Sequence, residues 1–112
     1  MIATDPSRPA EPTVTFCGGA REVTGSMHLV KAHGRTILLD CGLFLQRNAE
    51  GMQRNRTFPF DPRRLDAVIL SHAHVDHSGN LPNLVRQGYS GPIYCTPPTR
   101  DLADRMVECV LA

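Results

Sequence analysis

The sequence of 112 residues lacks tryptophan altogether, and only 5% of its residues are aromatic. It also lacks any apolar run approaching the roughly 18 residues that a membrane-spanning helix requires. Residues 1–6 show neither the basic nor the apolar segment of a secretory signal. These absences predict a cytoplasmic protein with no membrane partner. The remaining composition, 41% hydrophobic and 21% charged, is that of an ordinary globular domain.

Neither sign of charge is in excess, because 12 basic and 11 acidic residues leave a net charge of +1. Such a balance argues against a protein that binds nucleic acid through its whole surface, but it leaves room for a local basic patch. Five arginines fall within the irregular segment 42–64: Arg47, Arg54, Arg56, Arg63 and Arg64. Two interpretations of these arginines stay open, a contact with the phosphate groups of RNA and an ordinary solvated face.

The four cysteines are widely spaced, and no Cys-x-x-Cys pair occurs. This spacing excludes a zinc ribbon and a thioredoxin motif. We expect free thiols, most of which pack as small apolar side chains.

The hydrophobic pattern divides the chain into a proline-rich start, residues 1–12, expected to be a flexible tail, and one partial α/β domain, residues 13–112. Strands are expected at 14–17, 27–32, 35–40, 65–70 and 91–96, and helices at 47–54, at 80–87 and from a cap at Thr99 onward. The short turn His33-Gly34 predicts a hairpin. The continuous apolar run 65–70 is typical of a strand buried on both faces. The alternation of strands and helices from residue 65 predicts a βαβ arrangement.

Three of the five histidines lie in the segment 72–77, directly after the expected strand 65–70. Its pattern is His72-x-His74-x-Asp76-His77. Imidazole and carboxylate groups are the usual ligands of zinc, and α/β sheets place their sites at the carboxyl ends of strands. In a turning loop the first two histidines face one ion, and Asp76 and His77 face a second ion. A solvated polar turn is the alternative, but four donors crowded into six residues favour a metal site.

This motif resembles the signature of the metallo-β-lactamase superfamily. Residues 19–26 (Gly-Ala-Arg-Glu-Val-Thr-Gly-Ser), residues 37–44 and residues 65–74 are similar to the β-CASP branch of that superfamily, which contains RNA-processing nucleases. The resemblance covers residues 13–112. It implies an α/β fold that is the amino-terminal half of a metallo-β-lactamase αββα sandwich.

The resemblance implies two zinc ions and a role for each residue of the motif. His72 and His74 match ligands of the first ion, and Asp76 and His77 match ligands of the second. Asp76 also matches the catalytic residue that orients the hydroxide. Asp40 matches an aspartate that supports the metal-binding loop from behind, as outer carboxylates commonly do.

The resemblance implies that the reaction is metal-dependent hydrolysis of RNA phosphodiester bonds. Further ligands and the β-CASP domain with its RNA cleft follow later in the family, whereas no histidine follows His77 here. The last expected helix also reaches Ala112 without a stop signal. We therefore expect a truncated chain that is inactive alone, exposes apolar sheet surface, and needs a carboxy-terminal half or a second copy.

Two other functions stay open at this point. The first is another hydrolase of the same superfamily, acting on thioesters or lactams. The second is a non-catalytic fragment that only binds a partner or completes itself with a second polypeptide. In the glycine-rich loop, Glu22 and Ser26 either line the site or form a polar turn. Cys41 adjoins Asp40, but the family does not use it as a ligand.

Overall fold

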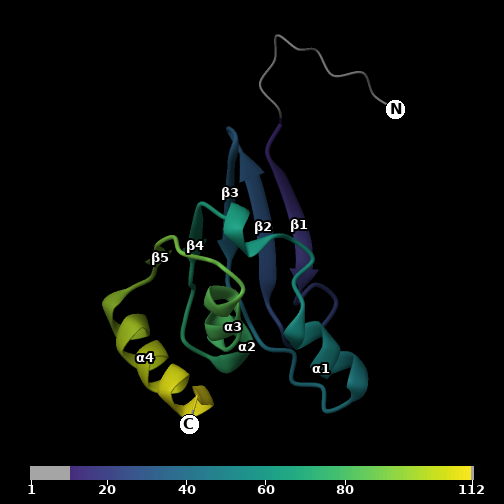
Figure 1. The fold of residues 1–112 in the computed structure, drawn as a ribbon, viewed down its shortest axis with the longest axis vertical. Coiled ribbons are helices and arrows are strands. Elements are labelled where there is room, and N and C mark those ends of the chain that lie inside the picture. The colour runs from purple at the N-terminus through teal and green to yellow at the C-terminus, as the bar shows by residue number, and fades with distance from the viewer. Residues whose placement is uncertain (1–10, 112) are drawn as a thin grey trace.

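The computed structural model describes residues 11–111, with side chains up to residue 105 (Figure 1). Its elements are β1 (Thr13–Gly18), β2 (Met27–Ala32), β3 (Arg35–Leu39), α1 (Ala49–Arg56), a 3₁₀ turn (Pro62–Arg64), β4 (Ala67–Ile69), α2 (Val75–Ser78), α3 (Leu81–Arg86), β5 (Ile93–Tyr94) and α4 (Pro97–Leu111). Most of the expected tail, residues 1–10, lies outside the described residues, and Glu11 and Pro12 have no regular structure. No described helix combines the length and apolar character needed to cross a membrane.

The amino-terminal half of the sheet is the predicted hairpin with one more strand at its edge. β2 pairs antiparallel with both β1 and β3. His33 and Gly34 join β2 to β3 with φ values of 51° and 74°. Two left-handed residues in succession are typical of the two-residue turn that suits the twist of a hairpin. The predicted hairpin is therefore confirmed.

The second half of the sheet is parallel, so the predicted βαβ arrangement is confirmed. β4 pairs parallel with β3 and with β5, in the order β1-β2-β3-β4-β5. The predicted strands 65–70 and 91–96 were too long, because only three and two of their residues pair as strands. The predicted cap at Thr99 is wrong, since α4 begins at Pro97. Proline suits the first helical turn, where its missing N–H leaves no bond unmade.

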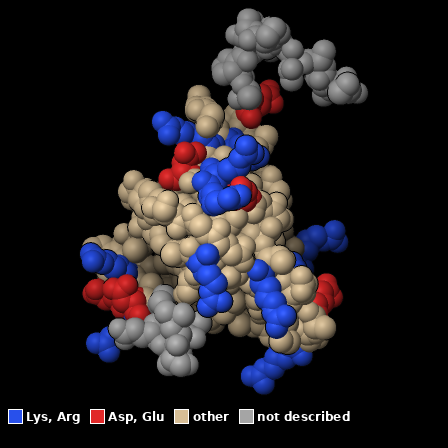
Figure 2. Space-filling model, viewed as in Figure 1, with Lys and Arg blue, Asp and Glu red and all other residues tan. Residues whose placement is uncertain are grey.

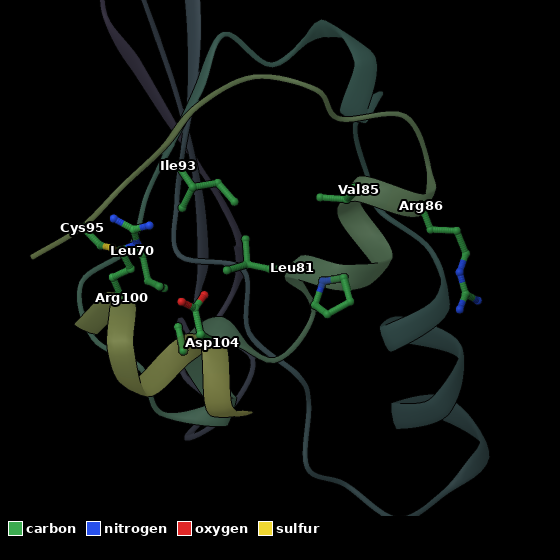
Figure 3. Close-up of a pocket in the computed structure, with 10 residues that line it drawn as sticks. Leu70, Leu81, Val85, Arg86, Ile93, Cys95, Arg100 and Asp104 are labelled. Carbon is green, nitrogen blue, oxygen red and sulfur yellow. The ribbon is translucent and has the colours of Figure 1, made fainter. Parts of the chain in front are cut away.

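The core lies on one face of the sheet. Leu29, Leu38 and Val68 stand side by side across β2, β3 and β4 and are 6% exposed or less. From the helical layer, Leu84 of α3 is fully buried in the same cluster. A cavity of about 600 Å³ lies between α3 and α4 (Figure 3), and its lining residues include none of the predicted ligands.

The opposite face of the sheet is apolar and open in the described residues, as expected for a chain that exposes apolar sheet surface. The run 65–70, whose apolar character is typical of a strand buried on both faces, is therefore covered on one face alone. One row across the strands runs through Phe16, His28, Leu39, Ile69 and Tyr94. Phe16 is 65% exposed and Tyr94 is 59% exposed. Apolar surface of this extent marks a region that associates with other surfaces.

We predict that Ile69→Lys shifts the chain toward the monomer and changes its free energy of unfolding by less than about 1 kcal/mol. The matched control is Val68→Lys, one residue away on the buried face, which should lose well over about 3 kcal/mol because it buries a charge. Sedimentation velocity gives the oligomer distribution and urea denaturation gives the stability. Equal effects of the two lysines would contradict the assignment of the faces.

Candidate metal centre

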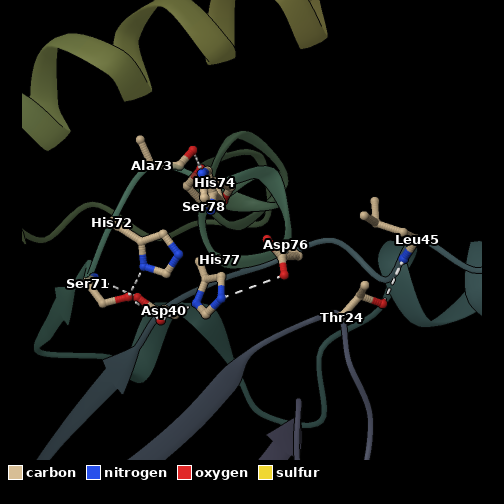
Figure 4. A network of polar contacts seen from close by, with 10 residues as sticks. All are labelled: Thr24, Asp40, Leu45, Ser71, His72, Ala73, His74, Asp76, His77 and Ser78. Carbon is tan, nitrogen blue, oxygen red and sulfur yellow. Dashed lines mark hydrogen bonds and ion pairs between the residues drawn. The ribbon is translucent and has the colours of Figure 1, made fainter.

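The side chain of Asp40 joins the end of β3 to the loop that follows β4 (Figure 4). Its carboxylate accepts hydrogen bonds from the backbone N–H and the hydroxyl of Ser71, both at 2.7 Å, and from Nδ1 of His77 at 2.8 Å. The residue is 7% exposed and has a φ of 62°, in the left-handed region. Such a backbone costs energy for a residue other than glycine and is characteristic of functional sites. Asp40 therefore lies where its predicted supporting role requires it.

These hydrogen bonds determine which ring nitrogens remain free. A carboxylate only accepts, so Nδ1 of His77 carries the hydrogen that Asp40 receives. Ser71 has one hydroxyl hydrogen and donates it to Asp40, so Nδ1 of His72, 2.9 Å from the Ser71 Oγ, is the donor of that second bond. In the neutral form of both histidines, Nε2 keeps its lone pair. An imidazole with Nδ1–H held by another group is the usual form of a zinc ligand.

All four predicted ligands lie in the segment between β4 and α3, and they come close to one another in pairs. The rings of His72 and His77 have centroids 4.0 Å apart, and those of His72 and His74 are 4.9 Å apart. Asp76 Oδ2 lies 3.7 Å from His77 Nε2. The donor types and the free Nε2 atoms fit zinc. Within the described residues, however, no three His, Cys, Asp or Glu side chains already form a metal site, so the ligand roles stay predictions.

Backbone hydrogen bonds hold this loop between two neighbouring segments. The N–H of Cys41 donates to the carbonyl of His77 at 2.8 Å, and the N–H of Ser26 donates to the carbonyl of Asp76 at 2.9 Å. Gly42 donates in turn to the carbonyl of Ser26. A Cβ at Gly42 would overlap the carbonyl group of Asp76, so only glycine allows this approach. Ser26 thus contacts the loop through its backbone rather than through its hydroxyl.

Cys41 is fully buried beside Asp40. Burial, and to a lesser degree the neighbouring carboxylate, raises the pKa of its thiol far above the ordinary value. Zinc is bound by the thiolate rather than by the thiol. A metal-binding role for Cys41 therefore has no support in the structure, as the family resemblance implied.

Sequence reasoning missed the partners of two charged residues. Glu22 accepts two hydrogen bonds from the guanidinium of Arg54, the longer of them 2.9 Å. Its partner lies 32 residues away, and no local pattern points to it. Arg63 pairs with Asp61, so at least two arginines of segment 42–64 bind carboxylates of the protein itself.

On the face shown in Figure 2, Lys and Arg side chains are scattered rather than gathered in one patch.

Residues 20–111 match the family model described as the metallo-beta-lactamase superfamily. The chain belongs to this superfamily. Ribonuclease TTHA0252 of Thermus thermophilus is 51% identical over 94 residues, which are 84% of this chain and 21% of that protein. Transcription termination factor FttA of Methanocaldococcus jannaschii is 46% identical over 89 residues, which are 80% of this chain and 14% of that factor.

These relatives confirm the resemblance to the β-CASP branch of RNA-processing nucleases, and with the family match they support a hydrolase. The chain spans about a fifth of the first relative's length and less of the second's. Human tRNase Z, short form, has the same fold, with a TM-score of 0.57 at 22% identity over 91% of this chain and 41% of that one. The metallo-beta-lactamase fold protein YhfI from Bacillus subtilis gives a TM-score of 0.58 at 25% identity, over 84% of this chain and 42% of that one. The predicted α/β fold, as part of a metallo-β-lactamase domain, is confirmed.

We predict that Gly42→Ala destabilises the chain by about 3 kcal/mol, because the added methyl group forces the loop away from Cys41. Gly34→Ala is the matched control. It faces open space and bears only the strain of its left-handed φ, so it should cost about 1 kcal/mol. Urea denaturation measures both changes. A cost at Gly42 no larger than that at Gly34 would contradict the close approach of these segments.

The Glu22–Arg54 pair predicts a dependence of stability on acid. Hydrogen bonds from Arg54 hold the pKa of Glu22 below its ordinary value of 4.5. The folded state therefore binds this proton less readily than the unfolded state, and the stabilisation is complete above pH 4.5 and declines as pH falls through the folded pKa. Thermal melts of the wild type and of Glu22→Gln between pH 7 and pH 3 should converge at the acid end. Parallel curves would show that Glu22 is not paired in solution.

Proposed function

We propose that this chain forms part of a cytoplasmic, zinc-dependent ribonuclease that hydrolyses RNA phosphodiester bonds. The observation that carries the proposal is the orientation of His72 and His77, whose Nδ1 atoms are occupied and whose Nε2 atoms are free. The names of the relatives, a ribonuclease and a transcription termination factor, support RNA as the substrate. The relatives extend well beyond the matched segment, and we propose that the remaining ligands and the RNA cleft come from such a segment or from a second chain.

Two zinc ions are proposed, one held by His72 and His74 and the other by Asp76 and His77. When bound, zinc would supply a Lewis acid for the phosphoryl oxygen and a water with a pKa near 7. His72 and His77 carry the ring hydrogen on Nδ1, so neither ring has to move it before Nε2 binds zinc. Asp40 keeps the hydrogen of His77 at Nδ1, and the carboxylate of Asp76 lies on the Nε2 side of the same ring.

We predict that the chain binds zinc through the loop histidines, and that His72→Ala and His74→Ala each remove most of this binding because each removes a ligand. The matched control is Cys41→Ala, which should leave the affinity nearly unchanged. Isothermal titration calorimetry measures the binding, with circular dichroism as a check of folding. Loss of binding in Cys41→Ala alone would mean that the site is assigned to the wrong residues.

The activity is tested by a chimera in which this chain replaces the matched 94-residue segment of the Thermus ribonuclease. We expect the zinc-loaded chimera to cleave single-stranded RNA, and its His74→Ala variant to lose at least about 100-fold in rate, since the ligand set is broken. The isolated chain should cleave no more RNA than its own His74→Ala variant. A folded, zinc-binding chimera that hydrolyses thioesters or β-lactams but not RNA would contradict the proposal.

A further inference from the structure

The ion pair between Glu22 and Arg54 has a geometry that ordinary surface pairs lack. Two guanidinium nitrogens donate to the two carboxylate oxygens, which fixes the orientation of both groups. The side chains are only 31% and 26% exposed, for arginine and glutamate respectively. The guanidinium also lies over the ring of Phe44, 3.7 Å from its centroid. Two groups, the carboxylate of Glu22 and the ring of Phe44, therefore define one position for Arg54, whereas an exposed pair is mobile and contributes little.

The β1–β2 loop, residues 19–26, packs against the ring of Phe44. The ring is 4% exposed, and a Cβ at Gly18 or at Gly25 would overlap it. The loop contains three left-handed residues, Gly19, Arg21 and Gly25. Glycine permits many backbone conformations, so we expect the position of this loop to depend on what it contacts.

The far end of this loop contacts the candidate metal centre. The N–H of Ser26 donates to the carbonyl of Asp76 at 2.9 Å, and the carbonyl of Ser26 accepts from Gly42 at 3.1 Å. Thr24 ties the loop to the segment after β3, because its hydroxyl accepts from the N–H of Leu45 at 3.1 Å. A displacement of the loop would therefore move the backbone of Asp76, one of the proposed ligands.

We propose that Arg54 is a positioning residue of the metal centre. It rests on the ring of Phe44 and holds Glu22. The loop that carries Glu22 places the amide of Ser26, and that amide holds the backbone of Asp76. This proposal rests on the proposed function, because it takes Asp76 as a ligand. It also separates Arg54 from the arginines available to RNA, since two of its guanidinium nitrogens already donate to a carboxylate and one of its faces lies on an aromatic ring.

The proposal is tested on the 112-residue chain with Glu22→Gln, Arg54→Gln, the double variant and Arg54→Lys. Arg63→Gln is the matched control, because it breaks an exposed ion pair of the same segment. The metal-free readout is hydrogen exchange of the Ser26 amide by NMR, compared with amides of β2 and β3. The second readout is the zinc dissociation constant.

We expect exchange of the Ser26 amide to quicken about tenfold in Glu22→Gln and Arg54→Gln, as loss of a charge-assisted hydrogen bond implies. Zinc affinity should fall about tenfold in the same variants, as it does when outer groups around a metal are removed. The double variant should lose no more zinc affinity than either single variant, because the two substitutions break the same ion pair. Arg54→Lys should give an exchange rate and a zinc affinity between those of the wild type and of Arg54→Gln, since lysine keeps the charge but not the bidentate contact. Arg63→Gln should match the wild type.

Unchanged Ser26 exchange in the folded Glu22 and Arg54 variants would overturn the proposal. So would a uniform rise in exchange over all amides, because it would show a general loss of stability rather than a local release. Absence of zinc binding by the wild type would count against the proposed function alone, since the exchange measurement decides the role of Arg54 without metal.

Discussion

The hydrogen-bonded carboxylate of Asp40 is the interaction on which the candidate centre depends. It lies where β3, the end of β4 and the histidine loop meet. It accepts two hydrogen bonds from Ser71 and one from His77. Through Ser71 it also determines the proton position of His72, which it does not touch. Asp40 holds this position with a φ in the left-handed region, a strained conformation for a residue other than glycine. The chemistry of the loop thus follows from one residue outside the motif.

The rest of the site is held by contacts between irregular segments rather than by long elements. α2 has four residues and β4 has three, so neither confers much rigidity alone. Instead, Gly42 allows the segment after β3 to lie against the backbone of Asp76, and the β1–β2 loop closes on the same carbonyl. The sheet positions these segments, because packing on its buried face fixes the ends of β3 and β4, where the segments begin.

Much of this arrangement could be predicted from the sequence, where the signal is local. The hairpin followed from a two-residue turn, and the four donors followed from their spacing after an apolar run. The strand ends near residues 65 and 94 could not be predicted, since apolar composition continues past the last paired residue. The Glu22–Arg54 pair and the contact of Gly42 with Asp76 join residues more than thirty positions apart, and only the folded chain brings them together. The open face of the sheet is expected from the missing part of the family domain, but the sequence pattern alone does not show which residues lie on it.

The most direct test of this account is the tautomer of His77 in the metal-free chain, read from long-range ¹H–¹⁵N NMR correlations of the histidine rings. If the Asp40 carboxylate orients the ring, the neutral imidazole carries its hydrogen on Nδ1 in the wild type. Asp40→Ala should abolish that preference, whereas Asp66→Ala, which removes a carboxylate outside this network, should preserve it. A wild-type His77 with its hydrogen on Nε2 would contradict the account, because the nitrogen assigned to the metal would then be blocked.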